Sequence, residues 1–487
     1  MPRQSIRFLR KGRIVELENV PAMRTVLDYL RLTEMSKGTK EGCNEGDCGA
    51  CTVALGTLVD GKVVYEPVNA CIMLLGQLEG KELITIDDLA QEGELHPLQR
   101  AFVDSHASQC GFCTPGFIMA LFTLYHSGVK PTRQEIVDHV AGNLCRCTGY
   151  RPIVDAATQA CTGAIADSWA NDASADFLAE LQDENDIQIG DENAFFAAPA
   201  TSDALAALYA AHPNATIVAG ATDVGLWITK QLRLLPKIIS VGRARGFDTI
   251  EDVPDHISIG AGATYADAAP FLENIDPDIG EVIRRIGAKQ VRASGTIGGN
   301  IANGSPIGDM PPMLIALGST LHLRHGNGLR SMPLENFFLA YGKQDRRPGE
   351  LVWRIDVPKL KPYEKFRSYK LSKRRDQDIS AVMASFKFNL EGRKIVSARI
   401  TFGGMAATPK RAVKTEAALR LASLDEPLTW DAALTALQDD YQPVADMRAS
   451  AEYRMDMAKA LLSRALIEIS AGQTHPLRLA GAREQAV

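Results

Sequence analysis

The sequence predicts an α+β protein of several domains, on three observations. The chain has 487 residues, more than one hydrophobic core usually organises, so two to four domains are expected. All nine cysteines lie in the first third of the chain, between Cys43 and Cys161. From Ala194 onward, helical patterns alternate with strand patterns. Cysteine chemistry is therefore confined to the N-terminal part.

Composition narrows the functional classes. Apolar residues make up 46% of the chain and charged residues 23%, as in soluble globular proteins. The net charge of −6 gives no support for nucleic-acid binding. The first seventeen residues alternate apolar and charged side chains, without a run long enough for a signal peptide or a membrane span. We therefore expect a cytoplasmic protein whose reduced thiols serve a metal or redox centre, not disulfides.

The first cysteine motif is EGCNEGDCGACTV, at Glu41–Val53. Its C-x4-C-x2-C spacing, with one more cysteine downstream, is that of a plant-type [2Fe–2S] loop. The interleaved glycines permit positive φ angles and close backbone approach. A zinc site usually has two C-x2-C pairs, which this loop lacks. The motif predicts a [2Fe–2S] cluster held by Cys43, Cys48, Cys51 and Cys71.

The residues around this loop predict a β-grasp, ferredoxin-like domain over residues 1–90. Ser5–Leu17 reads as a hairpin that turns at Lys11-Gly12. Thr25–Arg31 has the apolar face of a helix. Thr52–Tyr65 reads as a second hairpin, with its turn at Asp60-Gly61.

The second cysteine set lies in SQCGFCTPG and GNLCRCTGYRP. Prolines at helix starts and a capping box at Thr132–Glu135 predict a four-helix bundle over residues 91–165. Its cysteine pairs would lie at helix ends, where helix dipoles favour thiolates. The spacing alone leaves zinc and iron–sulfur equally open. The neighbouring ferredoxin-like domain favours a second [2Fe–2S] cluster, held by Cys110, Cys113, Cys145 and Cys147. Cys161, expected in mid-helix, is interpreted as a buried apolar residue.

The next segment is acidic. No Lys or Arg occurs from Pro152 to Ile228, and Ala166–Asn193 is rich in Asp and Glu. This composition predicts a flexible linker over residues 166–193. An acidic docking tail is the alternative.

Two glycine-rich turns follow in residues 194–365. A helix is expected over Ser202–Ala211, and the strand Ala215–Ala219 runs into AGATDVG. Further on, Gly295–Asn300 reads GTIGGN. Such turns, with several free N–H groups, can cradle a pyrophosphate, although most are plain tight turns. Neither turn matches G-x-G-x-x-G, so a Rossmann site is not expected.

The remaining residues, 366–487, predict strands followed by helices. Strand patterns flank Glu391-Gly392, and Lys414–Gly472 is mostly helical.

The motifs QCGFCTPG and NLCRCTGYRPI, after a plant-type cluster loop, resemble those of the molybdenum hydroxylases of the xanthine dehydrogenase group. The resemblance covers nearly the whole chain except the acidic linker. It implies that Gln109 lies against a molybdopterin, that the second cluster is nearest the molybdenum, and that the first is nearest a flavin.

The stretches VAGATDVG and GTIGGNIANGSPIGD resemble the pyrophosphate loops of that family's flavin domain. The resemblance implies a two-subdomain α+β FAD-binding domain over 194–365 and a C-terminal α+β domain, similar to that of CO dehydrogenase flavoproteins, over 366–487. Ile286 stands where animal xanthine dehydrogenases have an aromatic residue against the flavin, which weakens the stacking expected there. The implied FAD-site residues are Ile217, Val218, Ala219, Gly220, Ala221, Thr222, Asp223, Val224, Ile286, Thr296, Ile297, Gly298, Gly299, Asn300, Asp309, Val352 and Lys370.

The resemblance also implies a division of labour. No molybdenum domain follows in the given sequence, so the chain is expected to be the small subunit of a split bacterial enzyme. A large molybdenum-cofactor subunit would complete a heterotetramer of two small and two large chains. Electrons from hypoxanthine or xanthine would pass through the two clusters to FAD, which reduces NAD; no catalytic residue beyond FAD is expected in this chain. The alternatives are a related enzyme acting on aldehydes or N-heterocycles, a stand-alone iron–sulfur flavoprotein reductase, and a zinc-stabilised binding module.

Overall fold

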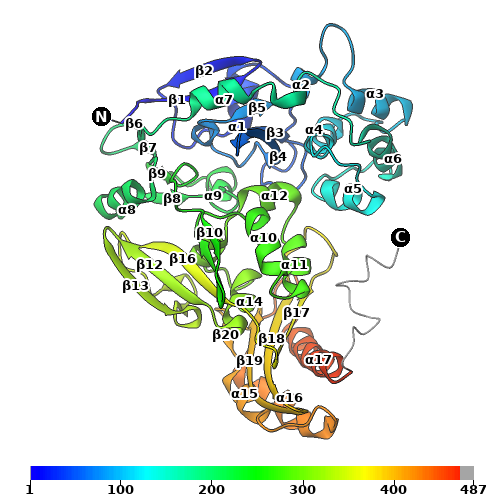
Figure 1. The fold of residues 1–487 in the computed structure, drawn as a ribbon, viewed down its shortest axis with the longest axis vertical. Coiled ribbons are helices and arrows are strands. Elements are labelled where there is room, and N and C mark those ends of the chain that lie inside the picture. Colours follow the sequence, from blue (N-terminus) through cyan, green and yellow to red (C-terminus); the bar gives the residue numbers. More distant parts are fainter. Residues whose placement is uncertain (1, 472–487) are drawn as a thin grey trace. The chain divides into compact units, whose positions relative to one another are not determined.

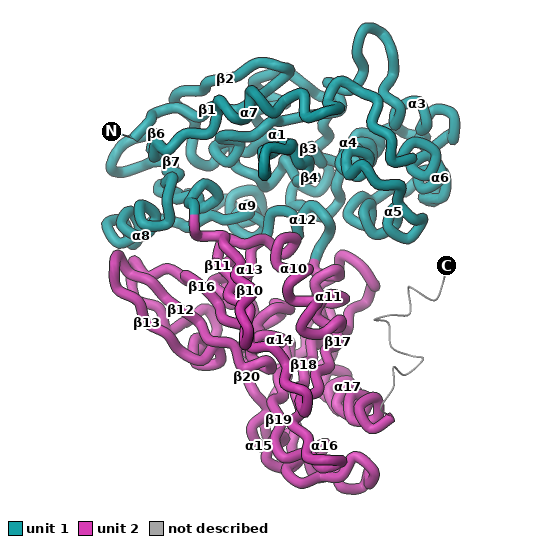
Figure 2. Tube along the Cα trace, viewed as in Figure 1, with its two compact units in different colours: residues 1–245, 287–295 teal, residues 246–286, 296–487 magenta. Residues whose placement is uncertain are grey.

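A computed structural model describes residues 2–471, which form two compact units (Figures 1 and 2). The first unit comprises residues 2–245 and 287–295, and the second comprises 246–286 and 296–471. The sequence-based expectations for Gly472 and for the rest of 472–487 lie outside the described residues. None of the described helices is long and apolar enough to cross a membrane.

The first unit begins with the predicted β-grasp sheet. Its strand order is β2-β1-β5-β3-β4, with β1 parallel to β5 and the other pairs antiparallel. Both predicted hairpins are confirmed, and the turn residues Lys11-Gly12 and Asp60-Gly61 have the positive φ angles that two-residue hairpin turns require. The elements are β1 (Ser5–Arg10), β2 (Arg13–Glu18), α1 (Val26–Asp28), which continues as a π-helical turn (Tyr29–Thr33), β3 (Thr52–Val59), β4 (Lys62–Asn69), a 3₁₀ turn (Leu75–Leu78), β5 (Glu82–Ile84) and α2 (Ile86–Leu89).

Four helices follow, as predicted: α3 (Pro97–Asp104), α4 (Thr114–Tyr125), α5 (Arg133–Val140) and α6 (Arg151–Ala160). The helix α4 is apolar almost all round and is buried at the centre of this bundle. The predicted capping box is present, because Thr132 and Glu135 exchange hydrogen bonds at the start of α5. Cys161 is buried, as expected, but it is the C-cap of α6 and not a mid-helix residue.

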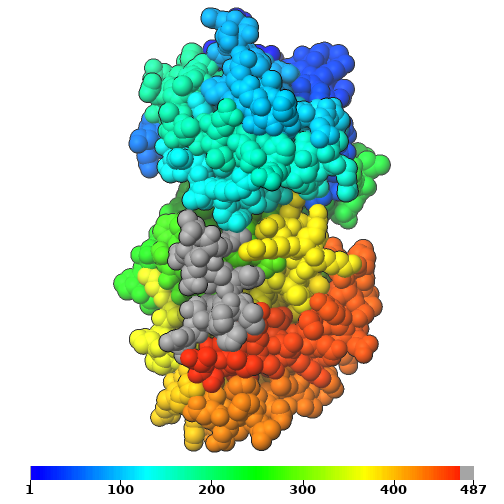
Figure 3. All heavy atoms as spheres, turned by 90° about the vertical axis from the view of Figure 1, so that its right-hand side faces the viewer, coloured from blue at the N-terminus to red at the C-terminus, as the bar shows by residue number. Residues whose placement is uncertain are grey.

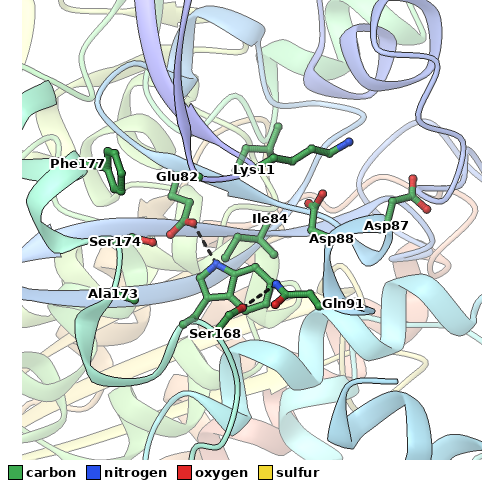
Figure 4. A pocket seen from close by; sticks show the side chains of 13 residues that line it. Lys11, Glu82, Ile84, Asp87, Asp88, Gln91, Ser168, Ala173, Ser174 and Phe177 are labelled. Atoms are coloured by element: carbon green, nitrogen blue, oxygen red, sulfur yellow. Dashed lines mark hydrogen bonds between the residues drawn. The ribbon is translucent and has the colours of Figure 1, made fainter. Parts of the chain in front are cut away.

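The segment 166–193 is not the flexible connector that its composition predicts. It forms a short 3₁₀ turn (Ala170–Asp172) and the helix α7 (Ala175–Leu181), whose Leu178 and Leu181 are buried against Leu9. Trp169 Nε1 donates to Glu82 over 3.1 Å (Figure 4), and the segment borders a cavity of about 510 Å³.

The acidic side chains of this segment have basic partners that are distant in sequence. The Asp183 carboxylate accepts hydrogen bonds from Arg7 (2.6 Å) and Arg243 (3.0 Å). One oxygen of Asp167 accepts from the Nε2 atoms of His96 (2.8 Å) and His126 (2.9 Å). Local composition contains none of these partners, and for this reason it predicted disorder.

A four-stranded sheet completes the first unit, in the order β6-β7-β9-β8. The helix α12 belongs to this unit although it comes much later in the chain. The elements are β6 (Ile187–Gly190), β7 (Phe195–Ala198), α8 (Ser202–Ala211), β8 (Thr216–Val218), α9 (Val224–Thr229), β9 (Lys237–Ser240) and α12 (Lys289–Ser294).

The second unit contains an antiparallel sheet in the order β10-β11-β16-β12-β13. Its elements are β10 (Ile250–Asp252), β11 (His256–Gly260), α10 (Tyr265–Glu273), α11 (Pro277–Arg284), α13 (Ile297–Asn303), α14 (Met310–Leu317), β12 (Thr320–His325), β13 (Gly328–Pro333), a 3₁₀ turn (Leu334–Asn336), β14 (Phe338–Ala340), β15 (Lys343–Gln344) and β16 (Leu351–Pro358).

The last part of this unit is a four-stranded sheet, β17-β18-β19-β20, whose apolar side chains form one core with the C-terminal helices. The predicted hairpin at Glu391-Gly392 joins β18 to β19. In the space-filling view, α17 (red) lies against the orange segment that contains α15 and α16 (Figure 3). The elements are β17 (Glu364–Leu371), β18 (Val382–Glu391), β19 (Lys394–Gly403), β20 (Lys410–Arg411), α15 (Val413–Ala418), a 3₁₀ turn (Pro427–Trp430), α16 (Asp431–Asp440) and α17 (Ala451–Ser470).

Candidate functional site

The first cysteine loop turns backbone amides toward its sulfur atoms. The N–H groups of Asp47 and Cys48 each donate to Cys43 Sγ over 3.3 Å, and the N–H of Cys43 donates to Cys48 Sγ over 3.3 Å. Gly46 and Gly49 have φ angles of 76° and 69°, which only glycine adopts without cost. Such N–H···S contacts stabilise thiolates and tune the potential of a bound cluster.

The four thiols of the first set form two pairs. A hydrogen bond from the Cys48 thiol and nearby backbone amides lower the pKa of Cys43 to about 5, against the opposing effect of burial. Hydrogen bonding to Cys51, together with burial, raises the pKa of Cys71. The pairs are thus Cys43 with Cys48 and Cys51 with Cys71. Two thiol pairs with amides directed at sulfur fit a [2Fe–2S] cluster, in which each of two irons takes two protein ligands.

The second cysteine set is also paired but more open. Cys113 hydrogen-bonds with Cys145, and Cys110 with Cys147. Cys110 and Cys147 are exposed, whereas Cys113 and Cys145 are half-buried. Cys113 is the N-cap of α4, and burial followed by the Cys145 hydrogen bond raises its pKa to about 12. These two pairs fit a second two-iron cluster.

The loop 145–150 is held by its own side chains. Burial opposes ionisation of Cys145, but hydrogen bonds from Thr148 and nearby amides outweigh it and lower the pKa. The N–H of Cys145 donates to the hydroxyl of Tyr150 over 3.0 Å. In the part of the chain that the structure describes, no three His, Cys, Asp or Glu side chains form a group suited to a single metal ion.

The two cysteine loops are in direct contact. The N–H of Leu144 donates to the carbonyl of Cys48 over 3.0 Å, so a single hydrogen bond joins the backbone of the second cysteine loop to that of the first. A side chain on Gly116 would overlap the carbonyl oxygen of Gly49. Glycine at 116 therefore permits α4, which starts beside Cys113, to approach the first loop closely.

The predicted flavin loop Ile217–Val224 joins β8 to α9. No described residue accepts a hydrogen bond from the backbone N–H groups of Ala219, Gly220, Ala221 and Thr222. Ala221 has a φ angle of 57°, and this change of handedness is typical of anion-binding nests. Consecutive unpaired amides fit the pyrophosphate that the sequence predicts here.

This loop and its helix also contact the first cysteine set. The carbonyl of Ala219 accepts from Gln77 Nε2 over 2.6 Å. A side chain on Gly225 would overlap Ile72, the residue after Cys71. Lys230 Nζ, at the end of α9, donates to the carbonyl of Cys43. The sequence had identified the loop but not Gln77 or Lys230, because neither belongs to a motif.

The second predicted flavin loop, Thr296–Asn300, differs from expectation. It is the first turn of α13, and Thr296 caps it by accepting from the N–H of Gly299. The N–H groups of Ile297 and Gly298 donate to Ala263 and Ala261, so they are not the free donors that a glycine-rich turn suggested. A side chain on Gly298 would overlap Ala261, which makes this glycine a packing requirement.

Two residues predicted near the flavin ring, Asp309 and Lys370, form a buried ion pair. Lys370 Nζ donates to Asp309 Oδ2 over 2.6 Å and to Ser380 Oγ over 2.8 Å. Ser380 in turn donates to Asp309 Oδ1 over 2.5 Å. Ser380 was not among the predicted site residues, because it belongs to no motif and stands only at the end of a polar loop.

The other residues predicted for the flavin site, Asn300, Val352 and Ile286, lie in different parts of the second unit. Burial and the Asp309 charge raise the pKa of Tyr265, which also hydrogen-bonds with Asn300. Val352 is buried on β16 opposite Leu323 of β12. Ile286 is half-buried at the end of the α11 region.

The residues around the second cysteine set lie largely at the surface. Gln109 is exposed, and Phe112 and Tyr150 are 48% and 40% exposed. Phe117, by contrast, is fully buried in the bundle core.

Four family descriptions match successive parts of the chain. Residues 9–75 match the "2Fe-2S iron-sulfur cluster binding domain" and residues 85–158 the "[2Fe-2S] binding domain". Residues 190–360 match the "FAD binding domain in molybdopterin dehydrogenase". Residues 367–469 match the "CO dehydrogenase flavoprotein C-terminal domain".

Curated relatives and solved structures agree with these domain matches. The rat xanthine dehydrogenase/oxidase is 31% identical over 84% of this chain and 35% of its own length, and the rice xanthine dehydrogenase is 30% identical over 80% and 34%. This chain thus spans about a third of the curated relatives it matches. A solved CO dehydrogenase chain from Oligotropha carboxidovorans is 27% identical, with a TM-score of 0.53, over 56% of this chain and 96% of that one.

These matches confirm the predicted α+β domain composition of two [2Fe–2S] domains, an FAD-binding domain and a C-terminal flavoprotein domain. The chain carries, in order, the iron–sulfur and FAD domains of the molybdenum hydroxylase family.

Proposed function

We propose that this chain is the cytoplasmic electron-transfer subunit of a bacterial xanthine dehydrogenase. A separate large subunit would oxidise hypoxanthine or xanthine at a molybdenum cofactor, in a heterotetramer of two small and two large chains. The electrons would pass through two [2Fe–2S] clusters to FAD and then to NAD. The clusters and FAD supply the chemistry, single-electron transfer at iron and hydride transfer at the flavin.

The observation that carries this proposal is a continuous series of contacts within the first unit. The second cysteine set contacts the first through Leu144 and Cys48. The first set contacts the flavin loop through Ile72 and Gly225, and through Lys230. This series of contacts supports the order second cluster, first cluster, flavin.

The protein groups have separate tasks in this scheme. Backbone amides of Cys43–Cys48 stabilise thiolates, and those of Ala219–Thr222 would hold the flavin pyrophosphate. The buried Lys370–Asp309 pair offers a fixed charge arrangement for the flavin ring region. Val352 and Ile286 would line that region, with less stacking than an aromatic residue provides.

The exposed residues of the second set indicate where the partner binds. Gln109, Cys110, Phe112, Cys147 and Tyr150 are all exposed, and an exposed apolar group beside a thiol set is typical of an interaction surface. We propose that this face meets the large subunit and that Gln109 approaches its molybdopterin.

The share of the chain that is matched favours the xanthine type over the alternatives. The rat and rice xanthine dehydrogenases match over 84% and 80% of this chain, whereas the solved CO dehydrogenase chain matches over 56%. A partner acting on another heterocycle or an aldehyde would keep the same electron path, and the exposed thiols argue against a reductase that works alone.

The test uses the purified holo-chain. Alone it should reduce a dye with NADH but should not oxidise xanthine. Addition of the large subunit should restore xanthine-dependent NADH formation. Xanthine oxidation by the isolated chain would contradict the division of labour, and restoration only with aldehydes would identify the alternative substrate class.

A further inference from the structure

One buried glutamine joins the segments that carry both cysteine sets. Gln290 of α12 is 1% exposed, and its Nε2 donates to Thr52 Oγ1 over 3.1 Å and to Asn143 Oδ1 over 2.9 Å. Asn143 Nδ2 donates in turn to the carbonyl of Gly49 over 3.0 Å. Gly49 follows Cys48, Thr52 follows Cys51, and Asn143 is two residues before Cys145. The amide of Gln290 therefore holds both loops beside their thiols.

Glycines allow the three segments to approach at backbone distance. A side chain on Gly142 would overlap Ala288 and the side-chain oxygen of Gln290. A side chain on Gly49 would overlap the carbonyl of Gly142. The separation of the two loops and α12 is thus set by backbone contact and by a few buried hydrogen bonds, which tolerate little displacement.

The other end of α12 contacts the flavin loop. A side chain on Gly220 would overlap the backbone of Ser294 and Gly295. Gly220 is one of the four residues of that loop whose amides have no acceptor among the described residues. A helix of six residues therefore contacts the two cysteine loops at one end and the pyrophosphate loop at the other.

We infer that Gln290 is a positioning residue, which through α12 fixes the separation of the two clusters and the flavin. The inference rests on the proposed function, because it concerns electron transfer between these cofactors. Electron exchange slows as the distance between cofactors increases, so even a small displacement of one cysteine loop should lower its rate. Loss of the Gln290 amide should therefore slow electron exchange without emptying any cofactor site.

The test compares the holo-chain with Gln290→Met, which keeps the side-chain length but removes both N–H donors. Iron, acid-labile sulfide and flavin content should equal those of the parent chain. In EPR, the magnetic splitting between the two reduced clusters should weaken. After pulse reduction of the flavin, electrons should reach the clusters severalfold more slowly than in the parent chain.

Gln182→Met is the control. Gln182 Nε2 likewise donates two hydrogen bonds in the first unit, to the carbonyl groups of Gly80 (3.3 Å) and Leu178 (3.4 Å). Its side chain is exposed, and these contacts involve no cysteine loop. It should leave the splitting and the rate unchanged. Gly142→Ala, which removes no polar group but pushes against Ala288, should reproduce the effect of Gln290→Met.

The outcomes separate the two claims. Parental splitting and rate in Gln290→Met would overturn the inference, as would loss of iron from that variant, because Gln290 would then be a folding residue. A parent chain without iron or flavin would instead contradict the proposed function.

Discussion

The two cysteine sets share their pairing but differ in exposure. In the first set Cys51 and Cys71 are 2% and 1% exposed, whereas Cys43 and Cys48 are half-buried and their sulfurs accept backbone N–H hydrogen bonds. In the second set Cys110 and Cys147 lie at the surface beside Phe112 and Tyr150. A buried centre exchanges electrons with its own chain, whereas an exposed one can exchange them with a second protein. The difference predicts an internal cluster that serves the flavin and an external one that serves the partner.

The largest expected effect is the selective loss of one cluster. Cys48→Ser should abolish the cluster of the first set, and Cys147→Ser that of the second, because each thiolate is one of the four proposed ligands of its cluster. EPR of the reduced chain should lose one of two signals in each case. Cys161→Ser, at the buried C-cap of α6, should keep both signals. Bound zinc in place of iron would show that the sites are structural.

The next effect concerns the flavin. Gly220→Val should empty the FAD site. Gly220 lies in the loop whose amides are unpaired, and a valine side chain there would overlap the backbone of Ser294. Flavin absorbance after gel filtration measures the loss, while iron content reports intact cluster domains. Gly242→Ala, a glycine of the same unit with open space around it, should retain FAD. Full flavin in Gly220→Val would disprove the loop assignment.

A smaller effect is expected at the exposed face of the second set. Phe112→Asp should weaken binding of the large subunit by about 2 kcal/mol, roughly 30-fold in Kd, as for an aromatic interface anchor. NADH–dye activity of the chain alone should not change. Phe177→Asp, at an aromatic residue of comparable exposure (40%) on α7, is the control and should bind the large subunit normally. Equal affinities of the two variants would place the interface elsewhere.

The smallest effect concerns the segment 166–193. Burial opposes ionisation of Asp167, but hydrogen bonds from His126 and His96 outweigh it and lower its pKa. Its carboxylate thus adds stability that is complete above the unfolded-state pKa of about 4 and is lost as pH falls toward the lower folded-state value. Asp167→Asn should cost about 1–2 kcal/mol at pH 7.

That difference should shrink as the pH falls from about 4 toward the lower folded-state pKa, because the unfolded chain is then protonated at Asp167 and the folded chain gradually becomes so. Denaturant unfolding at several pH values measures it. Asp104→Asn, at the exposed end of α3, should show no such dependence. A constant difference between Asp167→Asn and the parent at all pH values would rule out the charge as its cause.

Local motifs predicted the fold well, and long-range partners explain what they missed. Hairpin turns such as Asp60-Gly61 and the capping box at Thr132 act within a few residues, so the sequence predicts them directly. The acidic segment was misread because the partners of Asp183 lie at Arg7 and Arg243. Gln290 belongs to no motif, and only the folded chain brings it to Asn143.

We propose that this chain holds two clusters and a flavin that together conduct electrons. The most direct measurement is an anaerobic reductive titration of the purified holo-chain, followed by absorbance and EPR. The account predicts about four electrons per chain, one for each of two spectroscopically distinct [2Fe–2S] clusters and two for FAD. An uptake of about two electrons, with flavin bleaching and no iron signal, would contradict it.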